Sequence, residues 1–289
     1  MTLTQTQSLK TQAYDLGNGS VTLTNPLEIF ISKQSTKEGR KSSSQSELIK
    51  LRDPTLLGSG GGGAVFGYSL QQGNASPNKD GSSLPNAVAV KVSWKGSANS
   101  VRNECHILQV LEDRGVSRGV ERCLVSLDYP FDSNNRAMIV MEPVVDGKSA
   151  SNVVDLPTPA LQKTAVDQLM RIMLQIMAAG VVTTDVQPLI STDTGSVLLI
   201  DMTEAKVIES PPTFVDLALT TSFISEIWNL IPEDLVQLAS ESLLSEWKLL
   251  EESNDRKQWS PDVVQLLQDQ PLLSAAAADY IGESANSRK

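Results

Sequence analysis

The glycine-rich stretch LGSGGGGAVFGYSL, residues 57–70, constrains the fold more than any other part of the sequence. Glycine and serine dominate its first half, as in a flexible linker, but a strand pattern resumes at Val65. Glycines between two paired strands permit a turn whose backbone approaches a ligand where side chains would obstruct it. We therefore predict a strand, a loop and a second strand here, rather than a spacer.

A second constraint is a lysine in the middle of a strand pattern. Residues 87–93, AVAVKVS, predict a buried strand and place Lys91 within it. A buried ammonium group without a partner loses much of its hydration energy, so Lys91 requires an anion. The positions of the glycine run that match the spacing G-x-G-x-x-G-x-V are Gly58, Gly60, Gly63 and Val65.

This glycine spacing, followed by a lysine on a strand, resembles the protein-kinase superfamily. The resemblance implies an α+β, bilobal protein-kinase-like fold, in which a small antiparallel sheet lobe with one helix precedes a mostly helical lobe. It also implies that ATP, with Mg²⁺ or Mn²⁺, binds beneath the loop of residues 58–65. Ala89 and Lys91 would contact this nucleotide, Lys91 through the α- and β-phosphates.

The resemblance also implies a partner for Lys91. Residues 100–113, SVRNECHILQVLED, predict the single helix of the small lobe, and Glu104 is placed on it to orient the lysine. The alternative is that Glu104 is an ordinary surface residue.

Residues 138–147, MIVMEPVVDG, are similar to the last strand of the small lobe and the hinge that follows it. Backbone groups of Glu142 and Val144 would then face the adenine edge. Because Pro143 has no backbone N–H, Val144 is the expected donor.

Two aspartates in the second half match the kinase pattern less completely. In residues 180–206, GVVTTDVQPLISTDTGSVLLIDMTEAK, Asp185 takes the place of the catalytic aspartate and Asp201 that of the metal-binding one. The resemblance implies that Asp185 orients the acceptor hydroxyl and takes its proton, while Asp201 holds Mg²⁺ against the phosphates. The alternative is that Asp185 is a turn residue and Asp201 caps a helix or turn.

Several positions that kinases use for His-Arg, lysine, asparagine and Phe-Gly are replaced here, namely Thr183, Thr184, Gln187, Ile190 and Met202-Thr203. Isoleucine cannot coordinate Mg²⁺, so the site would use one metal or take Ser191 or Asp193 as a substitute ligand. No Ala-Pro-Glu motif follows Asp201, and we expect a reduced helical lobe without an activation segment.

Composition divides the chain into three parts. Residues 1–52 are polar and expected to be partly disordered, with short strands at SVTLT and LEIFIS and a flexible linker at residues 32–47. We expect the folded body to begin near Leu48. Residues 53–145 would form the small lobe and residues 146–289 the helical lobe.

The helical part opens with a clearly delimited helix. Thr158 is the expected N-cap, Pro159 occupies the first helical position, and Gly180 lies just past the end. Its methionines fall on one face and predict core packing; they are Met170, Met173 and Met177. Residues 195–202 predict a strand, and residues 220–253 and 260–283 predict helices interrupted at prolines.

Composition limits the partners and the compartment. A formal net charge of −10, with the acidic residues concentrated after residue 52, argues against nucleic acid, and no apolar run is long enough to cross a membrane. Cys105 and Cys123 are expected to be free, buried thiols in the cytoplasm, with a secreted effector as the alternative. The single histidine, His106, is expected to pack or to lie on the surface.

These observations predict an ATP-dependent phosphotransferase that modifies a Ser or Thr hydroxyl of a protein. Two alternatives remain open. One is a pseudokinase that binds a nucleotide or a protein partner without transferring phosphate, and the other is an enzyme that phosphorylates a small metabolite. Metal-dependent ATP turnover distinguishes the phosphotransferase from the pseudokinase.

Overall fold

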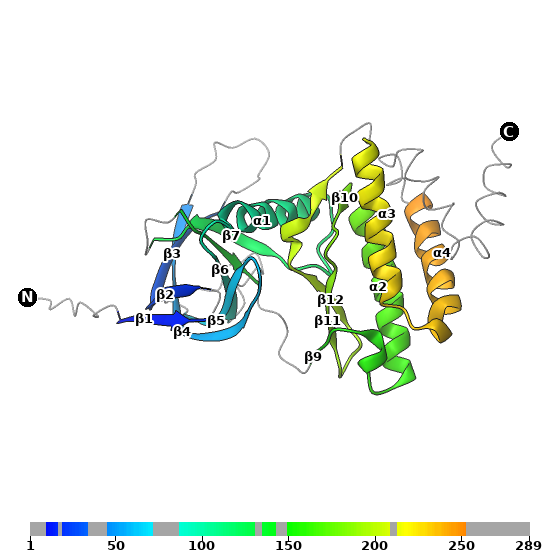
Figure 1. The fold of residues 1–289 in the computed structure, drawn as a ribbon, viewed down its shortest axis with the longest axis horizontal. Helices are drawn as coiled ribbons and strands as arrows, with labels where there is room; N and C mark the ends of the chain where they lie inside the picture. The colour runs from blue at the N-terminus through cyan, green and yellow to red at the C-terminus, as the bar shows by residue number, and fades with distance from the viewer. Residues whose placement is uncertain are drawn as a thin grey trace, which may run out of the picture. The chain divides into compact units, whose positions relative to one another are not determined.

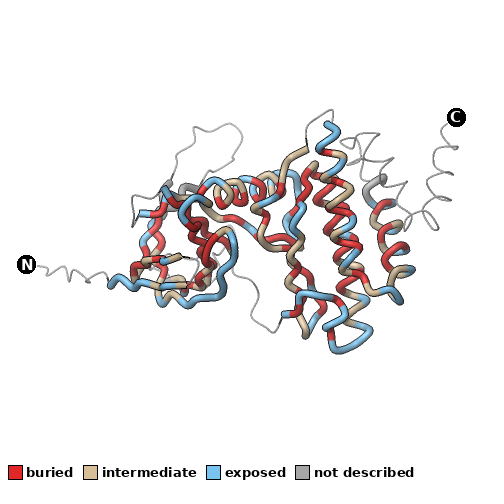
Figure 2. Tube along the Cα trace, in the orientation of Figure 1, coloured by how far each residue is buried: buried red, intermediate tan, exposed pale blue. Residues whose placement is uncertain are grey.

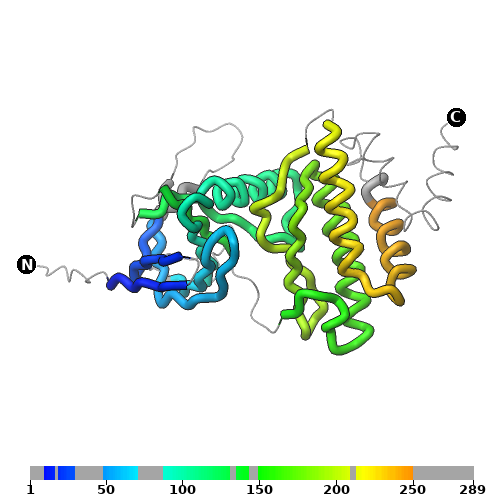
Figure 3. The backbone as a smooth tube through the Cα atoms, viewed as in Figure 1, coloured from blue at the N-terminus to red at the C-terminus, as the bar shows by residue number. Residues whose placement is uncertain are grey.

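The computed structural model describes residues 10–16, 19–33, 45–71, 87–130, 135–142, 149–208 and 213–252. The chain divides into two compact units, which Figure 3 allows the reader to follow along the backbone. Unit 1 comprises Met1–Cys105 and Cys123–Val144, and unit 2 comprises His106–Arg122 and Val145–Lys289. Both units mix helices with antiparallel strands, so the chain is α+β as predicted.

Unit 1 is built on a six-stranded antiparallel sheet in the order β3-β4-β5-β6-β8-β7 (Figure 1). Its strands are β3 Leu27–Lys33, β4 Gln45–Ser59, β5 Gly63–Gln71, β6 Ala87–Ser93, β7 Cys123–Asp128 and β8 Ala137–Met141. Helix α1, Ala98–Asp113, connects β6 to the segment before β7. The strands predicted from Val65, at residues 87–93 and from Met138, and the helix predicted at residues 100–113, are therefore confirmed.

A two-stranded hairpin begins the described chain, formed by β1 Lys10–Asp15 and β2 Ser20–Asn25. Alternation along β2 buries Val21 and Leu23 in the core of the sheet. The strands predicted at SVTLT and LEIFIS are confirmed, and the expectation that the folded body begins near Leu48 is wrong. Of the predicted linker, residues 34–44 lie outside the described part, and its two ends belong to β3 and β4.

The two faces of β6 bury different kinds of side chain. One face joins an apolar cluster that includes Val88, Val90, Val92, Phe66, Tyr68, Val21 and Leu23. The alternate residues Ala89 and Lys91 point to the opposite face and are also buried. The sheet therefore holds a lysine on a face that is closed to solvent.

Unit 2 is built around helix α2, Pro159–Ala178, which packs against α3, Phe214–Asn229, and α4, Val236–Glu252 (Figure 1). The predicted cap is present, because Thr158 Oγ1 accepts a hydrogen bond of 3.3 Å from the Leu161 N–H. Gly180 follows the helix with a φ of 66°. The predicted burial of Met170, Met173 and Met177 is confirmed. Figure 2 shows buried residues alternating with more exposed ones along the helices of unit 2.

Short strands and turns complete unit 2. The strands are β9 Ser149–Ala150, β10 Val181–Val182, β11 Gln187–Ser191, β12 Val197–Ile200 and β13 Lys206–Val207. The 3₁₀ turns are η1 Val153–Asp155, η2 Met202–Glu204 and η3 Glu233–Leu235. The strand predicted at residues 195–202 and the break at Pro232 are confirmed, whereas the helix predicted for residues 260–283 lies outside the described residues.

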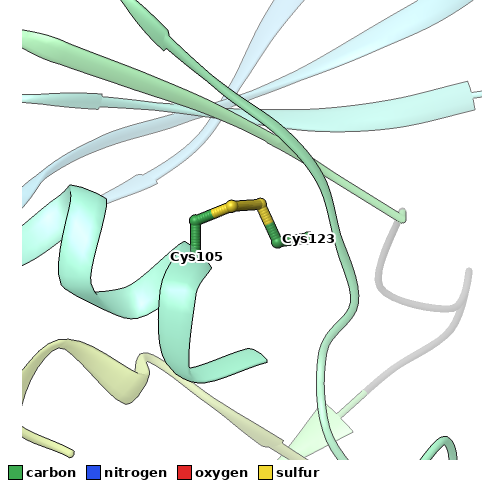
Figure 4. Close-up of a disulfide and its surroundings, with 2 residues drawn as sticks. All are labelled: Cys105 and Cys123. Carbon is green, nitrogen blue, oxygen red and sulfur yellow. A yellow bond between two sulfur atoms is a disulfide. The ribbon is translucent and has the colours of Figure 1, made fainter. Parts of the chain in front are cut away.

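The two cysteines form a disulfide between α1 and the first residue of β7, as Figure 4 shows. The expectation of free thiols is wrong, because the fold brings Cys105 and Cys123 to a Cα–Cα distance of 5.3 Å. That separation is within the range that a disulfide spans. His106, the next residue on α1, is exposed, in agreement with a surface placement.

Within the described helices, none alone has the length and apolar character to cross a membrane. Helices α3 and α4 meet that test only as a pair, across a bend of 105°.

Candidate functional site

The glycine run forms the turn of a hairpin, as predicted. Strand β4 ends at Ser59 and β5 begins at Gly63, and the two strands pair through Gly58 with Val65 and Ser59 with Ala64. The Gly60 N–H donates a hydrogen bond of 2.9 Å to the Gly63 carbonyl oxygen and closes the turn. The linker alternative is therefore excluded for this run.

The glycines in and beside this turn differ in whether the surrounding structure requires them. A Cβ at Gly63 would overlap the Val92 carbonyl oxygen on the neighbouring strand, so close strand packing requires glycine there. A Cβ at Gly58, Gly60 or Gly61 would meet no atom within 4 Å. Nothing within the described fold accounts for glycine at these three exposed positions, which is typical of a loop that leaves space for a ligand.

Trp94, directly after β6, holds the turn from one side. Its indole Nε1 donates a hydrogen bond of 2.6 Å to the Gly60 carbonyl oxygen, and its backbone N–H donates one of 3.1 Å to the Gly62 carbonyl oxygen. Among the described residues, no acceptor is assigned to the N–H groups of Gly61 and Gly62. Backbone N–H groups in a turn of this kind can bind phosphate oxygens.

The contact of Trp94 with the turn was not predicted from the sequence. Its only indication is a tryptophan at the end of a buried strand, where the indole N–H needs an acceptor.

Lys91 and Glu104 form a buried ion pair. Lys91 Nζ lies 2.8 Å from Glu104 Oε2, and the two side chains are 5% and 0% exposed. The predicted pairing is confirmed, and the surface alternative for Glu104 is wrong. Across the β5–β6 ladder, Lys91 lies opposite Val65 and Ala89 opposite Gly67. The residues predicted to contact the nucleotide in unit 1 therefore gather on adjacent strands.

The predicted hinge is described only at its start. Glu142 is half-buried directly after β8, whereas Pro143 and Val144 lie outside the described residues. Of the two hinge positions predicted to face adenine, Glu142 alone has a described place in the fold.

In unit 2, two antiparallel ladders bring the regions of Asp185 and Asp201 together. Strand β10 pairs with β13 through Val182 and Lys206, and β11 pairs with β12 through Gln187 and Ile200. Residues 183–186 and 201–205 are the two connections between these ladders. The fold therefore places both predicted aspartates at the same end of the β11–β12 hairpin.

Local hydrogen bonds fix each aspartate. The Asp185 N–H donates to Thr183 Oγ1 over 3.2 Å, and Gln187 Nε2 donates to Asp185 Oδ2 over 2.7 Å. Thus Gln187 contacts the aspartate directly.

Asp201 has a φ of 59° and begins the 3₁₀ turn η2. Its Oδ1 accepts a hydrogen bond of 2.7 Å from Thr203 Oγ1, but its side chain makes no capping bond to the backbone of η2. The left-handed conformation is uncommon for residues other than glycine, although aspartate adopts it more readily than most.

A further acid contacts this segment. The Asp201 N–H donates to Glu121 Oε2 over 3.3 Å, and Glu121 is 9% exposed. Sequence reasoning missed Glu121, because it lies eighty positions away from Asp201 along the chain.

Ser191 and Asp193, which the sequence suggested as substitute metal ligands, lie far from Asp201. Ser191 ends β11 and Asp193 lies in the turn beyond it, at the closed end of the hairpin. Asp201 lies at the opposite end, about 10 Å away or more at roughly 3.3 Å per residue. Ile190, at the position predicted to lack the second metal ligand, is fully buried in β11 and paired with Val197.

After η2, an ion pair attaches β13 to the start of α3. Lys206 Nζ donates to Asp216 Oδ1 over 2.8 Å, while Asp216 Oδ2 accepts hydrogen bonds from the Thr213 N–H and hydroxyl. These bonds lower the pKa of Asp216 to about 2, the Lys206 bond most strongly, although burial acts in the opposite direction. The Thr213–Asp216 capping box begins α3 soon after Asp201.

A separate hollow in unit 2 involves none of the predicted site residues. It measures about 390 Å³ and is lined by Arg118, Gly119, Gln168, Arg171, Ile172 and Gln175. Within the described part of the chain, no three His, Cys, Asp or Glu side chains gather as a metal-binding group.

The chain was compared with known proteins. It matches no protein-family model, and no curated protein is significantly similar to it.

Proposed function

We propose that this protein is an ATP-dependent phosphotransferase of protein-kinase type, which moves the γ-phosphate of ATP to a Ser or Thr hydroxyl of a protein. The observation that carries the proposal is the buried Lys91–Glu104 pair, next to a glycine turn. Lys91 holds the α- and β-phosphates, Glu104 orients Lys91, and the turn N–H groups cover the phosphates.

The Lys91–Glu104 pair supports a role in ligand binding, because a buried ion pair adds little to the stability of the fold. Removing two charges from water costs about as much as their attraction returns, and apolar residues of similar size often replace such pairs without loss. The sheet already packs an apolar cluster on its other face and has no packing need for a lysine at this position. A phosphate ligand supplies a reason, because it binds an already oriented ammonium group.

The acidic segments of unit 2 fit Mg²⁺ or Mn²⁺. Mg²⁺ in phosphotransferases is commonly held by one or two carboxylates together with substrate phosphates. Asp201 offers such a carboxylate, in a backbone conformation fixed by Glu121 and η2. When bound, the metal neutralises charge on the phosphates. Asp185, in the adjacent connection, orients the acceptor hydroxyl and takes its proton.

A pseudokinase is the second candidate, and one observation favours it. The position of the second metal ligand is buried inside β11, and the nearest substitutes lie at the other end of the hairpin. A nucleotide-binding module without transfer keeps the Lys91–Glu104 pair but has no need of this ligand.

Label transfer from γ-labelled ATP, with Mg²⁺ or Mn²⁺ and generic protein acceptors, tests the proposal. We expect transfer by the unmodified protein, a loss of at least about a hundredfold in Asp185→Asn and Asp201→Asn, and normal transfer by Asp193→Asn. Asp193 is the matched control because it is exposed at the far end of the same hairpin. ATP binding without transfer under either metal supports the pseudokinase, and the absence of both contradicts each candidate.

A further inference from the structure

The Cys105–Cys123 disulfide closes a loop of the chain whose residues, 106–122, belong to unit 2. Both cysteines belong to unit 1, whereas residues 106–122 between them belong to unit 2. The chain therefore leaves unit 1 immediately after one half-cystine and returns at the other. Figure 4 shows the bond joining the middle of α1 to the start of β7.

One end of the closed segment adjoins the Lys91–Glu104 pair. Glu104 immediately precedes Cys105 on α1, so the covalent bond is one residue from the carboxylate that contacts Lys91. Helix α1 buries the side chains of Val101, Leu108 and Leu111. Its position therefore depends on side-chain contacts and on the disulfide. The nearby Arg102–Asp128 ion pair adds little, because Asp128 is 87% exposed.

The other end of the closed segment adjoins Asp201. The Leu199 N–H donates to the Gly119 carbonyl oxygen over 2.8 Å, and the Glu121 N–H donates to the Leu199 carbonyl oxygen over 3.1 Å. Glu121 then accepts the Asp201 N–H through its carboxylate. The segment closed by the disulfide thus contacts the backbone of the metal-binding candidate, two residues before Cys123.

We propose that Cys105–Cys123 is a redox-sensitive clamp that fixes Glu104 at one end of residues 106–122 and Glu121, which contacts Asp201, at the other; this inference rests on the proposed function. A dithiol reductant opens it. One reductant thiolate attacks a cystine sulfur and forms a mixed disulfide, and the second thiol then displaces the protein sulfur. The protein gains two electrons and two protons as two thiols, and the reductant becomes a disulfide. In the reduced protein, α1 and residues 119–121 are each less restrained, and ATP binds less tightly.

The test compares the oxidised full-length protein with the same protein after dithiothreitol treatment. Thiol titration confirms reduction, and circular dichroism confirms that the fold is retained. We expect the Kd for ATP to rise at least about fivefold, the lower end of typical coupling between sites, and to recover on reoxidation. The Cys105→Ser/Cys123→Ser double variant should bind ATP like the reduced protein and ignore the reductant.

Hydrogen exchange separates this inference from the proposed function. Amides of α1 and of residues 119–121 and 199–203 should exchange faster after reduction, whether or not ATP binds. If the oxidised protein binds no ATP but exchange responds as expected, the proposed function fails and the clamp stands. Unchanged exchange and unchanged ATP affinity contradict the clamp. Global unfolding on reduction also contradicts it, because the bond is then a structural staple only.

Discussion

Lys91 Nζ lies 2.8 Å from Glu104 Oε2, and both side chains are almost completely excluded from solvent. The lysine comes from β6 in the centre of the sheet and the glutamate from α1. Each charge is tolerated only because the other is present, since an isolated buried charge is strongly unfavourable. The two residues should therefore behave as a unit in stability as well as in ligand binding.

Removing one charge should be far worse than removing both. Lys91→Met leaves the Glu104 carboxylate buried without its cation, which should lower the free energy of unfolding by about 3–5 kcal/mol. The double variant Lys91→Met/Glu104→Leu should recover most of this loss. Urea denaturation of the unmodified protein, the two single variants and the double variant gives the four free energies of a double-mutant cycle. Additive effects of the two single substitutions would mean that the pair is not coupled.

The glycines of the turn should separate stability from binding. Gly63→Ala forces a Cβ against the Val92 carbonyl and should lower the free energy of unfolding by about 1–3 kcal/mol. Gly60→Ala meets no atom, so its stability should change by less than about 0.5 kcal/mol. Its affinity for ATP should fall, because the added methyl group occupies space near the phosphates. Thermal unfolding with and without ATP measures both the stability and the ATP binding of each variant. A Gly60→Ala variant that is less stable than the unmodified protein would contradict this prediction.

Trp94→Phe tests how the turn is held. The substitution keeps an aromatic ring but removes the indole N–H that the Gly60 carbonyl accepts. We expect the free energy of unfolding to drop by about 0.5–1.5 kcal/mol, the usual value for one hydrogen bond. Faster hydrogen exchange should appear in residues 58–65. Exchange equal to that of the unmodified protein would show that this bond does not order the turn.

Asp216 should make stability depend on pH in acid. Its pKa falls from 3.8 to about 2 on folding, chiefly through the hydrogen bond from Lys206. A carboxyl with a lowered pKa stabilises the fold above its unfolded value of 3.8, and this contribution is lost as the pH falls toward about 2.

The corresponding variant is Asp216→Asn. It should reduce the free energy of unfolding by about 1–2 kcal/mol at neutral pH, through loss of the cap and the ion pair. The difference in the free energy of unfolding between the variant and the unmodified protein should shrink as the pH falls from 3.8 toward about 2. Denaturation at several pH values measures it, with the exposed Asp234→Asn as control. A difference that stays constant in acid would show that the ionised form of Asp216 contributes nothing.

Local patterns predicted much of the fold. The alternation in AVAVKVS and the N-cap, proline and glycine around α2 are local, and the structure confirms each of them. The Lys91–Glu104 pair was predictable because a buried lysine requires an anion and a family pattern suggested which one.

Other features depend on contacts between distant residues, which a single sequence does not encode locally. The disulfide, the Trp94 contact with the glycine turn and the Glu121 contact with Asp201 all depend on how strands and helices assemble. The strand at residues 187–191 was not predicted, because its extended form depends on pairing with β12.

Calorimetric titration with ATP and Mg²⁺ tests the central claim most directly, namely that the buried pair is part of an ATP site. The comparison is between the unmodified protein, Lys91→Met/Glu104→Leu, and a control that removes the exposed ion pair of Lys50 and Glu28 on β4 and β3. We predict that the unmodified protein and the control bind ATP equally. The Lys91/Glu104 variant should bind at least tenfold more weakly, about 1.4 kcal/mol. Equal affinity in all three proteins, or no binding by the unmodified protein, would contradict the account.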